Sequence, residues 1–128
     1  MRYLTPRKAA AGLGASGRGT AEHWSLTVSA VALAILTPLV IGVVAPAIGL
    51  TQAGVVAHFS RPYPAIVTGL FAIIGMAHWI RGSRILIDDY VEDPARPWVL
   101  IASQVFGWAV IAIAVFALAG MALASISA

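Results

Sequence analysis

The chain has 128 residues, of which 60% are hydrophobic and only 10% are charged, and its formal net charge is +3. A soluble domain carries about 25% charged residues, so the composition indicates an integral membrane protein. Cysteine is absent, which excludes disulfides, thiolate metal sites and iron–sulfur ligation by this chain. At about 20 residues per membrane crossing, the length leaves room for three transmembrane helices.

Residues 1–22 are polar, glycine-rich and basic, and we expect them to form a cytoplasmic N-terminal segment. A transit peptide is the competing interpretation, because Glu22 is the single acid in the segment. The segment has few hydroxyl residues and no clear amphipathic stripe, which speaks against a transit peptide.

Three apolar runs follow at about 24–50, 63–87 and 98–126, so that residues 23–128 form a three-helix transmembrane anchor. Pro38 lies in the middle of the first run and predicts a kink. A short hydrophilic link joins the first two runs, and Pro62 suits the first turn of the second helix. An acidic link joins the second run to the third.

The basic residues predict the orientation in the membrane. Most of them precede the first helix or flank the second link, Arg61 alone lies in the first link, and none follows the third helix. By the positive-inside rule, the N-terminus and the second link are cytoplasmic, and the first link and the C-terminus lie outside.

His78 lies inside the second apolar run, where an ionisable side chain is costly and a functional role is the default expectation. It is a candidate metal-cofactor ligand, a candidate proton relay, or a hydrogen-bonding partner of a neighbouring helix. Haem iron takes one ligand from each side. His23 begins the first helix and His58 lies in the external link, so neither is placed to be the second ligand. A haem at His78 would therefore need a partner subunit.

Asp89 and Tyr90 follow His78 by about 16 Å along a helix axis, which places them at the cytoplasmic boundary. In one interpretation, Tyr90 is an interfacial anchor and Asp89 belongs to a solvated loop. In the other, both contribute to a quinone site, where the Tyr90 hydroxyl donates a hydrogen bond to a quinone carbonyl and Asp89 lies beside it. Arg81, one turn cytoplasmic of His78, is a candidate cation for a haem propionate.

The string from His78 to Tyr90, H-W-I-R-G-S-R-I-L-I-D-D-Y, resembles the second-helix motif of the small hydrophobic membrane anchor subunits of succinate dehydrogenase. The positions that carry the resemblance are His78, Gly82, Arg84, Asp88, Asp89 and Tyr90. The start of the first helix, with the pair His23-Trp24, and the three-helix layout also look like that family. One departure is the pair Val28-Ser29, which occupies a window where many members carry an arginine. This window of the first helix therefore supplies no cation for a haem propionate.

The resemblance implies a non-catalytic anchor subunit of succinate:quinone oxidoreductase, respiratory complex II, which joins the tricarboxylic acid cycle to the respiratory chain. His78 would be one axial ligand of haem b, and a second membrane anchor subunit would supply the other. Tyr90 and Asp89 would contribute to the site for ubiquinone. FAD and the iron–sulfur clusters would belong to a flavoprotein subunit and an iron–sulfur subunit. The two membrane anchors would pack into one helical bundle in the bacterial inner membrane.

Three alternatives remain open. The first is the anchor of a related fumarate reductase. The second is a small structural or regulatory membrane protein without a cofactor. The third is a proton- or ion-conducting subunit that uses His78, although neither the first nor the third helix has a charged residue to continue a path.

Overall fold

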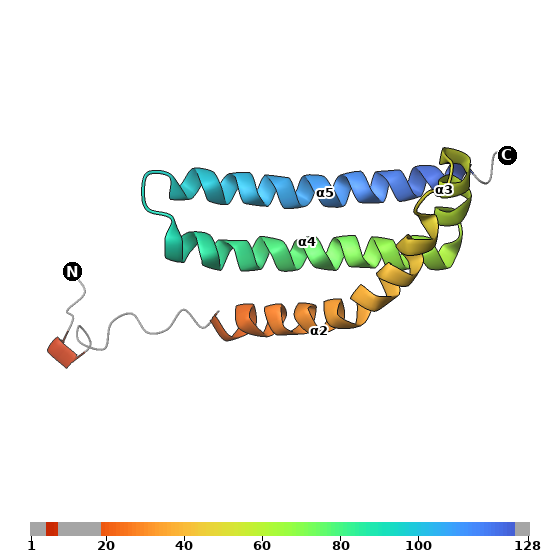
Figure 1. The fold of residues 1–128 in the computed structure, drawn as a ribbon. Coiled ribbons are helices and arrows are strands. Elements are labelled where there is room, and N and C mark those ends of the chain that lie inside the picture. Colours follow the sequence, from red (N-terminus) through yellow and green to blue (C-terminus); the bar gives the residue numbers. More distant parts are fainter. Residues whose placement is uncertain (1–4, 8–18, 125–128) are drawn as a thin grey trace.

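The computed structural model describes residues 5–7 and 19–124. Within these ranges the chain forms three long helices, α2 (Gly19–Val44), α4 (Pro62–Tyr90) and α5 (Arg96–Ala124), and no strand (Figure 1). Each long helix is long and apolar enough to cross a membrane. The expected all-α membrane fold with three spans is thus confirmed. Most of the expected N-terminal segment, residues 1–22, lies outside the described residues.

The first span, α2, begins at Gly19, earlier than the expected start at about residue 24, and bends toward its C-terminal end (Figure 1). Pro38 lies inside the helix. Its ring removes one backbone hydrogen bond and clashes with the preceding turn, which explains the predicted kink. The hydroxyl of Thr37 also donates to the carbonyl of Leu33 at 2.6 Å, a bond that favours bending.

The first link contains a helix that its hydrophilic composition does not predict. After α2 ends at Val44, a 3-10 turn η1 (Ala45–Ala47) follows, and Gly49 turns the chain with a φ of +86°, which glycine adopts without strain. The short helix α3 (Gln52–Phe59) begins next. Thr51 caps it, because its hydroxyl accepts a hydrogen bond from the backbone N–H of Gly54 at 3.3 Å.

The second span, α4, has Pro62 in its first turn, as predicted. It continues to Tyr90, past the expected end near Ile87. Asp88, expected in the second link, therefore belongs to the helix. There its carboxylate lies 3.8 Å from Nε of Arg84, which is four residues earlier on the same helix.

Residues 91–95 form a short link between α4 and α5. Nε of Arg96 donates to the carbonyl oxygen of Val91 at 2.8 Å, and Nη1 of the same residue lies 4.0 Å from the Asp93 carboxylate. Arg96 thus closes the turn and begins α5 at the same time.

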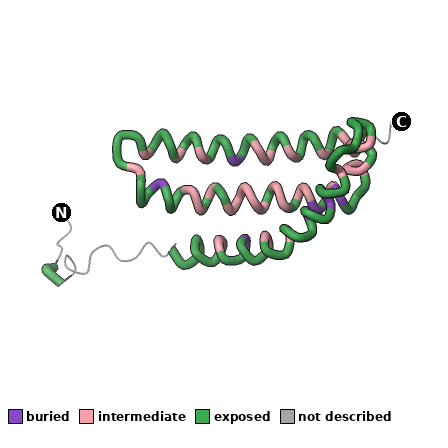
Figure 2. Tube along the Cα trace, in the orientation of Figure 1, coloured by how far each residue is buried: buried purple, intermediate pink, exposed green. Residues whose placement is uncertain are grey.

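The three long helices lie side by side in one layer, with α4 in the middle (Figure 1). Figure 2 shows how few residues of this layer are buried. A small core forms near one end from Val40, Val43 and Val67, with Phe59 and Phe71 packed against it. Since large apolar side chains are exposed on all three helices, the layer offers its faces to lipid or to a partner subunit.

Candidate functional site

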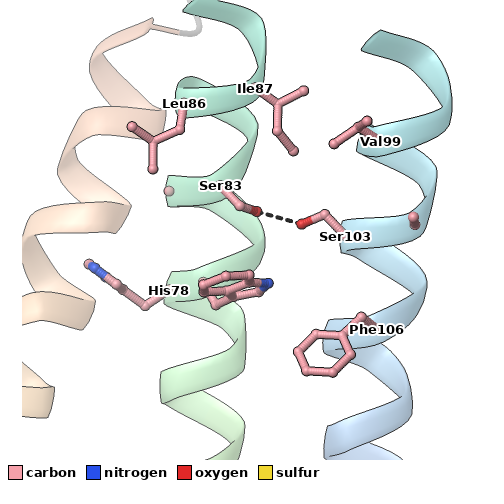
Figure 3. A pocket seen from close by; sticks show the side chains of 10 residues that line it. His78, Ser83, Leu86, Ile87, Val99, Ser103 and Phe106 are labelled. Carbon is pink, nitrogen blue, oxygen red and sulfur yellow. Dashed lines mark hydrogen bonds between the residues drawn. The ribbon is translucent and has the colours of Figure 1, made fainter. Parts of the chain in front are cut away.

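His78 lies about three helical turns before the end of α4. Its side chain is half-buried, and its ring points toward α2 (Figure 3). It lines an apolar cavity of about 620 Å³ between α4 and α5. It also lines a second cavity of about 480 Å³, to which α2 contributes Leu33 and α5 contributes Val110. Sites for small molecules and cofactors usually have volumes of about 300–1,000 Å³.

Ser29 of α2 holds the His78 ring. The two are 49 positions apart in the sequence, and Oγ of Ser29 lies 2.8 Å from Nδ1 of His78. The same hydroxyl donates to the carbonyl oxygen of Leu26 at 2.9 Å. Ser29 is one of the two residues in the window where many members of the family that the sequence resembles carry an arginine. The structure therefore puts a buried hydroxyl, and no cation, beside the histidine at this level of α2.

The larger cavity lies between α4 and α5. Two pairs of side chains that line it join the two helices. Ser83 and Ser103 share a hydrogen bond with an Oγ–Oγ distance of 2.7 Å (Figure 3). The rings of Trp79 and Phe106 meet edge to face, with centroids 6.3 Å apart. Gly82 lines the cavity one turn from His78, and a Cβ atom at this glycine would meet no atom within 4 Å.

Arg81 does not share a cavity with His78, although it lies one turn away on α4. Its Nη1 donates to the carbonyl oxygen of Ala77 at 3.2 Å. The Arg81 side chain lines a cavity of about 320 Å³, together with Glu22 and Arg84. This cavity lies where the first turns of α2 meet the last turns of α4. This cavity is more polar than the two beside His78, and it collects charges of both signs.

Asp89 and Tyr90 end α4, and both side chains are exposed, Tyr90 to 82%. The helix extends through both residues, so they do lie about 16–18 Å along the axis from His78. The structure thus separates the predicted site residues into two levels of one helix. It does not bring Tyr90 or Asp89 into either cavity that His78 lines.

The other two histidines lie away from His78. His58 is on α3, where its Nε2 is 2.9 Å from the carbonyl oxygen of Val43, so it ties α3 to the end of α2. His23 is exposed in the first turns of α2. Neither of them lines a cavity with His78.

Fold and site together define a small membrane protein with three candidate spans, in which His78 of the middle helix lies beside cavities of cofactor size. Residues 1–126 match the family model described as succinate dehydrogenase/fumarate reductase transmembrane subunit. The chain is also 59% identical over 126 residues to a succinate dehydrogenase hydrophobic membrane anchor subunit of Paracoccus denitrificans, and the match covers 98% of each chain. No solved structure matches it significantly.

The chain therefore belongs to the family of succinate dehydrogenase/fumarate reductase transmembrane subunits. This confirms the resemblance drawn from the His78–Tyr90 string. The roles of the individual residues stay predictions.

Sequence reasoning missed the importance of two serines. Ser29 stood out only as a departure from a family pattern, and Ser83 did not stand out. A hydroxyl residue inside an apolar run needs a hydrogen-bond partner, and this was the available signal. The sequence did not say which helix carries that partner.

Proposed function

We propose that this chain is the anchor subunit of a succinate:quinone oxidoreductase, where it shares haem b with a second anchor and forms part of the quinone site. The 59% identity to a succinate dehydrogenase anchor supports succinate oxidation rather than fumarate reduction as the reaction of the complex. The observation that carries the haem assignment is the place of His78, which lies inside a membrane span and lines two apolar cavities.

The residues around His78 fit a haem. A neutral imidazole in apolar surroundings is a common axial ligand of haem iron. The space at Gly82, one turn from His78, would leave room for such a group beside the α4 backbone. A haem bound there supplies a one-electron redox centre. The imidazole of His78 would hold the iron, and the apolar lining of the two cavities would keep water away from it.

In this proposal, a residue of the second membrane anchor subunit would also hold the haem iron. His58 is held by the carbonyl of Val43 at the opposite end of α2, and His23 lies in its first turns. The exposed apolar faces of the layer support a partner anchor that completes a helical bundle.

In this proposal, the quinone binds at the end of α4, where Asp89 and Tyr90 lie. The Tyr90 hydroxyl donates a hydrogen bond to a quinone carbonyl, and Asp89 holds a neighbouring group or a proton path. The high exposure of Tyr90 supports a site that partner subunits cover in the complex. The expected quinone is ubiquinone. The iron–sulfur subunit delivers the electrons, and the flavoprotein with its FAD oxidises succinate.

The orientation proposed from the basic residues places the N-terminus and the 91–95 link in the cytoplasm of a bacterial cell. The C-terminus then lies in the periplasm. The charged cavity of Glu22, Arg81 and Arg84 falls at the cytoplasmic end of the layer, where charged side chains reach water.

The test is the visible spectrum of the purified complex with and without dithionite. The wild-type complex should show the bands of a b-type haem, and His78→Ala should lose or alter them. His58→Ala is the matched control, because it removes a histidine at the other end of the layer. A normal spectrum and redox potential in His78→Ala would overturn the ligand assignment.

A further inference from the structure

Ser29 is the one buried polar residue among residues 5–7 and 19–124, with 9% of its surface exposed. Its hydroxyl takes part in two hydrogen bonds, one with the carbonyl of Leu26 and one with Nδ1 of His78. The second of these joins α2 to α4 at the proposed haem ligand. Together, these two hydrogen bonds indicate the position of the Ser29 hydroxyl proton and of the ring proton of His78.

A carbonyl oxygen only accepts, so the hydroxyl proton of Ser29 goes to Leu26. A serine hydroxyl has one proton, and toward His78 the oxygen therefore acts as the acceptor. Both bonds form at once only if Nδ1 of His78 carries the ring proton. A neutral imidazole carries a single N–H, so the lone pair of Nε2 is free. No described residue forms a hydrogen bond to Nε2.

We propose that Ser29 is a positioning residue for the haem ligand. It holds His78 in the tautomer whose Nε2 lone pair is available to iron, and it fixes the ring orientation before the haem arrives. This inference rests on the proposed haem ligation. A hydrogen-bond acceptor at the far nitrogen also makes the imidazole a stronger electron donor, which favours ferric over ferrous iron.

Removal of the hydroxyl should therefore weaken haem retention and raise the midpoint potential of the haem. In the purified complex, we expect Ser29→Ala to retain haem about tenfold less tightly, as is typical when such a second partner is lost. A tenfold change in the ferric-to-ferrous preference corresponds to a positive shift of about 59 mV for a one-electron couple.

Two variants separate the hydrogen bond from packing. Ser29→Thr keeps a hydroxyl that can bond the preceding turn, and it should restore the wild-type potential. Ser29→Cys is similar in size but offers only a weak acceptor, so its potential should move toward that of Ser29→Ala. The matched control is Ser25→Ala, one turn earlier on α2. The Ser25 hydroxyl donates to the carbonyl of Glu22 at 2.8 Å in the same way, and this bond involves no histidine.

Wild-type potential and spectrum in both Ser29→Ala and Ser29→Cys would overturn the proposal, and so would an equal shift in Ser25→Ala. If Ser29→Ala fails to assemble, the comparison of Ser29→Cys with Ser29→Thr decides. The haem assignment fails separately, through an unchanged spectrum in His78→Ala. In that case, ¹⁵N NMR of histidine-labelled complex still tests the tautomer, which should carry Nδ1–H in wild type and change in Ser29→Ala.

Discussion

Gly107 of α5 lies so close to Ile80 of α4 that a Cβ atom on the glycine would come within 2.6 Å of Cγ1 of Ile80. Gly107→Ala should therefore push the helices apart, at a cost of about 1–3 kcal/mol. The better helix propensity of alanine offsets about 0.5–1 kcal/mol of this. We expect a lower melting temperature of the purified complex. Gly120→Ala is the control, because a Cβ atom there meets nothing within 4 Å. Equal melting temperatures in the two variants would contradict the close contact.

Tyr90→Phe should slow quinone reduction and leave succinate oxidation by an artificial acceptor intact. The loss of one hydrogen bond to a neutral carbonyl costs about 0.5–1.5 kcal/mol, or about a two- to tenfold fall in kcat/KM for quinone. Tyr63→Phe, at the opposite end of α4, is the matched control and should match wild type. Parallel loss of both activities would indicate an assembly defect instead of a lost quinone contact.

Asp89→Asn should reduce quinone turnover by at least about tenfold, because the amide cannot hold or pass a proton as the carboxylate does. Asp88→Asn is the natural comparison, one residue earlier. Asp88 pairs with Arg84, but the two side chains are 47% and 61% exposed, and such a pair contributes little. Steady-state quinone reduction from about pH 6 to about pH 9 distinguishes the two variants. The assignment fails if both variants behave alike.

Arg81→Ala should lower the midpoint potential of the haem, opposite in sign to Ser29→Ala. We propose that the guanidinium leaves the carbonyl of Ala77 to meet a propionate, and a nearby cation favours the reduced form of the haem. Arg84→Ala, three residues on, controls for loss of a cation near the same end of α4. Unchanged haem content and potential in Arg81→Ala would remove this residue from the site.

Reporter fusions at the C-terminus test the orientation. Alkaline phosphatase, which folds only outside the cytoplasm, should be active there, and a fluorescent protein that folds only inside should stay dark. Fusion in the 91–95 link should give the reverse result. The opposite pattern would place Tyr90 and Asp89 on the outer side and separate them from the iron–sulfur subunit.

The three spans follow from the sequence alone, because a run of about 20 apolar residues has few stable alternatives to a membrane helix. The kink at Pro38 and the start at Pro62 follow too, since proline acts on the backbone locally. The helix ends were harder. Asp88 and Asp89 look like a link, yet α4 continues through both of them to Tyr90.

The helix α3 was also missed, because its eight residues lie in a stretch that composition alone marks as hydrophilic. The signal was local: Thr51 is a favourable N-cap two residues after a glycine turn. An N-cap of this kind favours helix formation in a short polar segment, and a hydropathy profile contains no information about capping residues.

Tertiary structure alone decided which residues meet across the helices. The sequence predicted that His78 lies inside a membrane span and that Asp89 and Tyr90 lie near the end of that span. It did not determine that Ser29 bonds His78 or that Arg81 faces another cavity. Membrane helices are apolar on nearly every face, so no hydrophobic stripe marks the packed side. The packed side is set by close steric fit and by single polar pairs, which exist only once the helices are side by side.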